Sequence, residues 1–167
     1  MKPDIIFYRE RHWWKYTLES DYSVNIDIHI PEFMAGTYFD GLVTITVDGA
    51  LLIRKGYCWD GASGPAIDTK SIMRPSLIHD VLYQLISEGC IDSGHRKRAD
   101  IIFRKELWKD VKEITARSKF SRVREFLGFI RIWYSYWAVR KFGAKFAKYS
   151  VHTAPVLGYN IFIDEAK

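Results

Sequence analysis

The sequence predicts one α+β domain, residues 1–167, in which strands come first and helices follow. Its length suffices for one domain with a hydrophobic core and is short for two. Apolar residues alternate with a period of two through much of residues 1–60, and they follow helical spacing from about residue 75. A glycine-rich loop over residues 61–70 separates the two halves, and no linker or internal repeat divides the chain.

The first 60 residues predict an antiparallel sheet that contains a hairpin. Residues 22–30 alternate, with Val24, Ile26, Ile28 and Ile30 on the buried side and Ser23, Asn25, Asp27 and His29 on the other. Residues 42–47 repeat this pattern. Asp48-Gly49 then separates two apolar runs, and this pair is the strongest short hairpin signal. Residues 13–18, WWKYTL, are a further strand candidate.

A pair of helices is predicted over residues 75–112. Apolar residues of the first helix follow helical spacing: Leu77, Ile78, Val81, Leu82, Leu85 and Ile86. Pro75 suits its first turn, and Gly89 suits the position just past its end. Because the connection to the second helix is short, we expect the two helices to pack antiparallel.

The second helix is capped by Asp92 or Ser93 and runs to about Lys112. Residues 121–148 form an aromatic and basic helical region, with an interruption near Gly143. The last apolar run, residues 158–165, is a candidate for a returning strand.

The net charge of +5 is unevenly distributed. Residues 117–148 hold nine Lys or Arg and one acid, whereas the rest of the chain is slightly acidic. Such a segment can face an anionic membrane, another protein subunit or nucleic acid. Nucleic acid is disfavoured, because the cations are scattered around the helix and no known nucleic-acid-binding module is present. The sequence leaves the oligomeric state open.

Three features indicate the compartment. Two cysteines, Cys58 and Cys90, form no disulfide framework and fit a reducing environment. We expect no secretory signal peptide, because the first residues lack an apolar core followed by a small-residue cleavage site. No run approaches the roughly 20 apolar residues of a transmembrane helix.

A polar constellation interrupts the apolar helix pair. His79, Asp80 and Tyr83 share the side of the first helix opposite its aliphatic residues. Asp100 lies within the apolar stripe of the second helix, where a carboxylate needs hydrogen-bond donors. The ring N–H of His79 and the hydroxyl of Tyr83 are suitable donors. That pairing would fix the imidazole tautomer and leave the other nitrogen to act as a general base.

Other interpretations of these residues are open. Asp100 can instead pair with Arg96 or Arg104, each four residues away on its own helix. His79, Asp80 and Tyr83 can form a purely structural network. Upstream, the loop GYCWDGASGP at residues 56–65 can aim backbone oxygens inward, and together with Asp80 these would suit Ca²⁺.

Three motifs, GYCWDGASGP, RPSLIHDVLY and RADIIF, occur in this order and resemble the mainly phage-encoded family catalogued as domain of unknown function DUF-1353. The resemblance covers roughly residues 40–110. It implies a phage-type protein in the host cytoplasm or the virion, with phage structural proteins as partners. The family carries no established activity.

A second resemblance bears on chemistry. The HDxxY sequence at His79 to Tyr83 is similar to the active-site helix of phospholipases A2, above all the disulfide-free viral type. That likeness implies His79 as base, Tyr83 and Asp100 orienting it, and Asp80 as calcium ligand. The candidate ligands in the loop are backbone oxygens near Gly61 and Gly64, with Asp60, which has no counterpart in those enzymes, as an additional acid.

Two functions follow from these observations. The first is Ca²⁺-dependent hydrolysis of a phospholipid-like ester, with water as nucleophile. The second is a non-catalytic virion or assembly component, for example a tail-associated one, which uses the same cluster structurally. In both, residues 117–148 are available to contact a phage protein or an anionic membrane surface.

Overall fold

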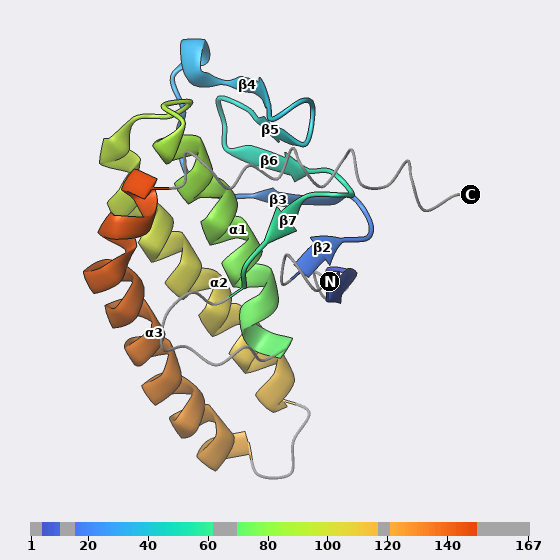
Figure 1. Cartoon of the computed structure of the whole chain (residues 1–167). Coiled ribbons are helices and arrows are strands. Elements are labelled where there is room, and N and C mark those ends of the chain that lie inside the picture. Colours follow the sequence, from blue (N-terminus) through green and yellow to red (C-terminus); the bar gives the residue numbers. More distant parts are fainter. Residues whose placement is uncertain (1–4, 11–15, 62–69, 117–120, 150–167) are drawn as a thin grey trace.

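The computed structural model describes residues 5–10, 16–61, 70–116 and 121–149 (Figure 1). Two antiparallel sheets precede three helices, which confirms the α+β prediction. The strands are β1 (Tyr8–Glu10), β2 (Tyr16–Leu18), β3 (Tyr22–Asn25), β4 (Gly36–Tyr38), β5 (Val43–Ile45), β6 (Ala50–Ile53) and β7 (Cys58–Trp59). The helices are α1 (Lys70–Ser87), α2 (Arg96–Ala116) and α3 (Ser121–Tyr149), with 3₁₀ turns η1 (Glu32–Met34) and η2 (Ser93–His95).

The strands form a three-stranded sheet in the order β1-β2-β7 and a four-stranded sheet in the order β3-β6-β5-β4. The alternation over residues 22–30 is confirmed by burial, because Ile26, Ile28 and Ile30 are buried and the residues between them are exposed. Regular β3 nevertheless ends at Asn25. Beyond it, the N–H groups of Ile26 and Ile30 donate to the carbonyls of Gly49 and Val47, at 2.9 and 3.0 Å, so the segment stays against the hairpin.

The hairpin predicted from Asp48-Gly49 is confirmed. β5 and β6 pair antiparallel with Ile45 opposite Leu51, and the turn closes with Gly49 at φ +81°. A Cβ on Gly49 would collide with the backbone oxygens of Ile26 and Ile28. Gly49 is therefore required both by the turn and by the close approach of the neighbouring strand.

We expect Gly49→Ala to lower the free energy of unfolding by more than Gly41→Ala. Both glycines have positive φ, but a Cβ on Gly41 would meet nothing within 4 Å. The control thus carries only the left-handed backbone cost of about 1–2 kcal/mol, and Gly49→Ala adds a backbone collision. Denaturant unfolding of both variants measures the difference, and equal losses would contradict the collision.

α1 begins five residues before Pro75, so the prediction that Pro75 lies in the first turn is wrong. The preceding turn is held by packing, because Ile72 and Met73 are buried in the core. The burial of these side chains outweighs the loss of the backbone hydrogen bond that Pro75, which has no N–H, cannot donate. The predicted end is confirmed: Gly89 has φ +70°, and the N–H of Cys90 donates to the carbonyl of Leu85 at 2.8 Å.

α2 is preceded by the 3₁₀ turn η2, whose cap is Asp92. The Asp92 carboxylate accepts from the N–H of Gly94 at 2.6 Å, so this predicted cap residue caps η2, which leads directly into α2. α2 continues to Ala116, four residues beyond the expected end.

α3 runs unbroken from Ser121 to Tyr149, so the interruption predicted near Gly143 is wrong. A single interior glycine costs only about 1 kcal/mol relative to alanine. The candidate strand at residues 158–165 lies outside the described residues.

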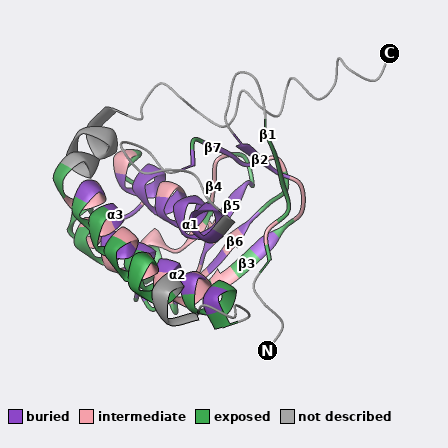
Figure 2. Cartoon of the chain, turned by 90° about the horizontal axis from the view of Figure 1, so that it is seen from below, coloured by how far each residue is buried: buried purple, intermediate pink, exposed green. Residues whose placement is uncertain are grey.

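α1 is buried along most of its length between the sheets and the other two helices (Figure 2). It packs antiparallel to α2, as predicted, because the early residue Arg74 meets the late residue Asp110 and His79 meets Asp100. α3 packs on α2 with its outer side facing away from the core (Figures 1 and 2). None of the helices in the described ranges combines the length and hydropathy needed to cross a membrane.

Candidate functional site

The centre of the candidate site is Asp100 on α2, which is completely buried. His79 Nε2 lies 3.0 Å from Asp100 Oδ1, and the Tyr83 hydroxyl donates to the same oxygen at 2.7 Å. The predicted pairing of α1 with Asp100 is therefore confirmed. The His79 ring is held further by Tyr83 and Phe103, whose ring centroids lie 4.1 and 5.2 Å from its own. Its orientation is thus set by contacts on both α1 and α2.

The second oxygen of Asp100 binds a residue that the sequence did not predict. Arg140 of α3 donates from Nη1 to Asp100 Oδ2 at 2.8 Å. Asp100 thereby joins all three helices. No sequence signal places Arg140 here, because it lies forty positions away in a region whose cations are predicted to face a partner.

The predicted alternatives for Asp100 are wrong. Arg96 donates instead to the Tyr83 hydroxyl at 3.3 Å and to the carbonyl of Arg140 at 3.0 Å. The guanidinium of Arg104 lies 4.6 Å from the centre of the Tyr136 ring. Arg96 therefore supports the site one contact away from Asp100, and Arg104 packs against α3.

The contacts of Asp100 hold it in its charged form. Burial alone would raise the pKa of this carboxyl, but hydrogen bonds from His79, Arg140 and Tyr83 outweigh burial and lower the pKa below its ordinary value. Burial likewise opposes the imidazolium of His79. The hydrogen bond to Asp100, together with the negative charges of Asp100 and the nearby Asp80, outweighs that penalty and raises the pKa of His79. The cluster therefore favours the imidazolium, which is the form that His79 takes once it has accepted a proton.

His79 Nδ1 points away from Asp100 and lies 3.7 Å from Asp80 Oδ1. The Asp80 side chain is 24% exposed, the most accessible group of the cluster on α1. Burial raises the pKa of Asp80, and the nearby charge of Asp60 adds to this, while the backbone N–H of Asp60 stabilises the carboxylate. Asp60 therefore lies close enough for its charge to act on Asp80, and both are predicted metal ligands.

Of the other predicted ligands, Gly61 directly follows Asp60, and Gly64 lies outside the described residues. No group of three or more His, Cys, Asp or Glu that could hold a metal ion occurs among residues 5–10, 16–61, 70–116 and 121–149. A cation at Asp80 would therefore also need backbone oxygens.

The segment that leads into this loop is fastened along α1, which sequence reasoning missed. The Tyr57 hydroxyl donates to Gln84 Oε1 at 2.7 Å, and Trp59 Nε1 donates to Ser76 Oγ at 3.2 Å. These two bonds lie on either side of Asp80 along the helix. Asp60 directly follows the second attachment, and its charge acts on Asp80.

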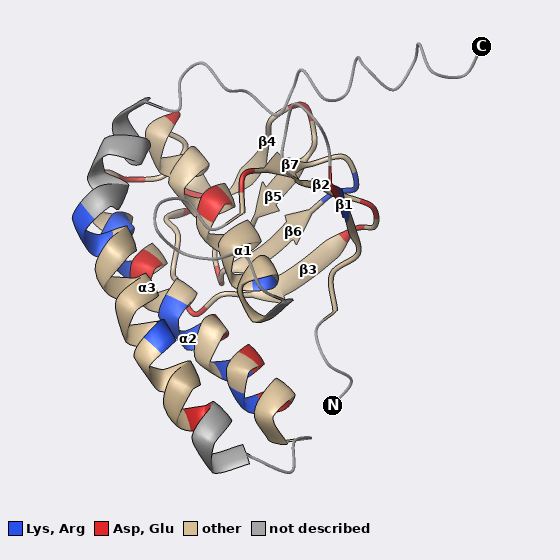
Figure 3. Ribbon diagram, turned by 60° about the horizontal axis from the view of Figure 1, so that its bottom comes forward, with Lys and Arg blue, Asp and Glu red and all other residues tan. Residues whose placement is uncertain are grey.

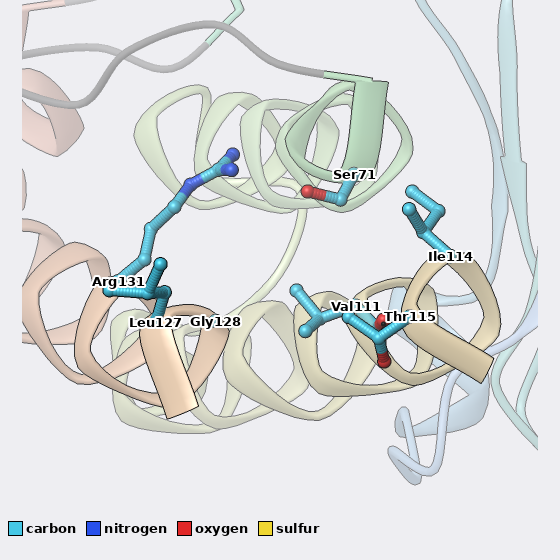
Figure 4. Close-up of a pocket in the computed structure, with 7 residues that line it drawn as sticks. All are labelled: Ser71, Val111, Ile114, Thr115, Leu127, Gly128 and Arg131. Carbon is cyan, nitrogen blue, oxygen red and sulfur yellow. Dashed lines mark hydrogen bonds between the residues drawn. The ribbon is translucent and has the colours of Figure 1, made fainter. Parts of the chain in front are cut away.

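A cavity of about 200 Å³ lies between the three helices, away from this cluster (Figure 4). Its walls are mainly aliphatic side chains of α2 and α3, with Ser71 of α1 and Arg131 of α3 at its edge. None of the candidate site residues lines it.

We expect Asp100→Asn to destabilise the fold at neutral pH, with a deficit that shrinks in acid. The folded-state pKa of Asp100 is lowered, so its carboxylate contributes stability above the ordinary carboxyl pKa. This contribution is lost as the pH falls through the lowered value. Unfolding free energies of both proteins, measured from pH 7 downward with chelator present, test this. A deficit independent of pH would show that the charge of Asp100 does not matter.

Comparison of the chain with protein-family models, with curated proteins and with solved structures finds no match. The resemblances to DUF-1353 and to phospholipases A2 stay predictions. Interpretation of the site therefore depends on its geometry.

Proposed function

We propose that the chain is a hydrolase of carboxylic esters of the phospholipid type, with His79 as the general base. One observation carries this proposal: His79 is bound through Nε2 to the buried Asp100, and Nδ1 is directed toward the partly exposed Asp80. A base needs one ring nitrogen fixed and the other open to a water molecule. The resemblance of HDxxY to the phospholipase helix points to the same assignment.

In this mechanism a water beside Nδ1 gives its proton to His79 while its oxygen attacks the ester carbonyl. Asp100 stabilises the imidazolium that forms, and Tyr83 and Arg140 hold Asp100 in place. When the tetrahedral intermediate collapses, the proton passes from Nδ1 to the departing alkoxide. The products are an alcohol and a carboxylic acid, which releases its remaining proton to solvent, and His79 returns to its starting form.

Calcium fits the donors around Asp80. The Asp80 and Asp60 carboxylates are hard oxygen donors, and backbone oxygens near Gly61 and Gly64 would complete such a set. When bound, the ion supplies positive charge that stabilises the oxyanion of the intermediate. The charge of Asp60 raises the pKa of Asp80, and a cation bound at Asp80 would offset this repulsion.

The second candidate is a non-catalytic virion or assembly component. It is favoured by the hydrogen bonds that join Asp100 on α2 to α1 and α3, because these bonds hold the three helices together. In this case the phage-type resemblance indicates the setting, in the host cytoplasm or the virion, and a phage structural protein is the partner.

Release of fatty acid from mixed phospholipid vesicles separates the two candidates. The hydrolase is expected to act in Ca²⁺ and to stop in chelator. Asp80→Asn is expected to abolish the response of the protein to Ca²⁺, because a hard divalent cation needs the full carboxylate charge. Thermal melting with and without Ca²⁺ is the second measurement. No hydrolysis by wild type and no calcium shift in melting would together refute the proposal.

A further inference from the structure

The outward side of α3 exposes an unusual density of large apolar residues. We call it the α3 aromatic face, which comprises Phe126, Leu127, Phe129, Ile130, Trp133, Tyr134 and Trp137. The side chains of Phe126 and Trp133 are each 64% exposed. The opposite side of the same turns is buried, with Ile132, Ser135 and Ala138 against the bundle. Exposed apolar residues that adjoin over several turns mark an interaction surface.

Lys and Arg residues occur along both α2 and α3 (Figure 3), and two of them lie over aromatic rings. Lys141 Nζ lies 4.7 Å from the centre of the Trp137 ring on α3. On the neighbouring helix, Lys112 Nζ lies 5.0 Å from the centre of the Trp108 ring, and that ring meets Phe129 edge-on at 6.2 Å. Over its whole length α3 carries seven Lys or Arg and one acid, Glu125, and one of these cations, Arg140, is bound to Asp100 on the bundle side. The surface therefore combines apolar side chains with a cationic margin.

We propose that the α3 aromatic face docks on an anionic lipid bilayer, with α3 lying in the plane of the headgroups. Trp and Tyr favour the membrane–water interface, where an apolar ring and a polar edge are both accommodated. Lys and Arg at the margin attract anionic headgroups. No described helix can cross the membrane, so the contact is peripheral. The proposal does not depend on the chemistry proposed for His79.

A second copy of the chain fits this face less well. Phe126, Ile130, Trp133 and Trp137 do follow the spacing of a coiled-coil seam, but such seams favour Leu, Ile and Val at these positions. Two copies would also bring together two surfaces with cationic margins. An anionic bilayer instead complements that charge and places no shape requirement on the bulky rings.

The test uses the full chain and vesicles of phosphatidylcholine with or without phosphatidylserine. We expect sedimentation with the vesicles that contain phosphatidylserine, and release as salt screens the charges. Phe126→Ser with Trp133→Ser should lower the bound fraction about tenfold or more, and Lys141→Glu should also weaken binding. Phe33→Ser is the matched control, because Phe33 is 83% exposed on η1 and should not affect binding.

Melting and circular dichroism verify that the variants remain folded. Absence of binding to the phosphatidylserine vesicles, or equal losses in Phe33→Ser and the double variant, would overturn the proposal. Light scattering adds a further outcome. A dimer that the double variant dissociates, without vesicle binding by wild type, would assign the face to a second copy.

Discussion

Replacement of His79 by glutamine is expected to lower ester hydrolysis by about 10²–10⁴-fold, the usual effect of losing a general base. Glutamine is close to histidine in size, and its amide can still donate a hydrogen bond toward Asp100. It cannot accept a proton at the position of Nδ1. The fold should therefore persist while the activity is lost. The measurement is fatty-acid release from mixed phospholipid vesicles in Ca²⁺, with thermal melting in parallel.

The matched control is His29→Gln, because His29 is exposed between buried isoleucines of the sheet region and contacts none of the site residues. It should leave both activity and melting unchanged. A structural role for His79 gives a different result, because wild type would then show no hydrolysis to lose. Full activity in His79→Gln would also exclude His79 as the base.

The site could be predicted in part because some of its determinants are local. His79, Asp80 and Tyr83 share one side of a single helix, and a carboxylate at Asp100 in an apolar stripe requires a donor from the neighbouring helix. Arg140 could not be predicted, because its contact depends on how α3 crosses α2. The attachment of Tyr57 to Gln84 likewise depends on how the loop lies along α1.

The fold shows the same division. Asp48-Gly49 and Gly89 act within a few residues, and the structure confirms the hairpin and the helix end that they predict. The predicted start of α1 was wrong, because burial of Ile72 and Met73 extends the helix ahead of Pro75. The separation of the strands into two sheets is also non-local, because β2 pairs with β7 across forty residues and the alternation pattern does not specify partners.

Arg74 is the clearest residue that the sequence did not predict. Beside Pro75 it resembles a surface arginine, yet its side chain is only 3% exposed. It lies 2.8 Å from Glu106 Oε2, and its Nε donates to both oxygens of Asp110 at 3.1 Å. Nη1 donates to the Tyr22 hydroxyl, so one guanidinium ties α1 to α2 and to β3.

We expect Arg74→Met to lower the free energy of unfolding by about 3–5 kcal/mol at neutral pH, the usual cost of leaving a buried charge without its partner. Two largely buried carboxylates, Glu106 and Asp110, would then lack their positive partner. No hydrogen bond within the described residues reaches Glu106 Oε2, so the charge of Arg74 is its main compensation. Burial already raises the pKa of Asp110, and the charge of Glu106 adds to this. Loss of Arg74 would raise the pKa further, so the deficit should shrink as acid neutralises the carboxyls.

Denaturant unfolding of Arg74→Met and Arg98→Met tests this expectation. Arg98 pairs with Asp27 at 2.9 Å, but the two side chains are 43% and 73% exposed, so its loss should change stability little. Adding Glu106→Gln and Asp110→Asn to Arg74→Met should recover part of the deficit, because the stranded charges are then removed. Equal effects of Arg74→Met and Arg98→Met would mean that the buried carboxylates do not need the guanidinium. Recovery in the triple variant would instead show that α1 and α2 are held together by charge compensation around Arg74, since packing alone would not respond to removal of the two acids.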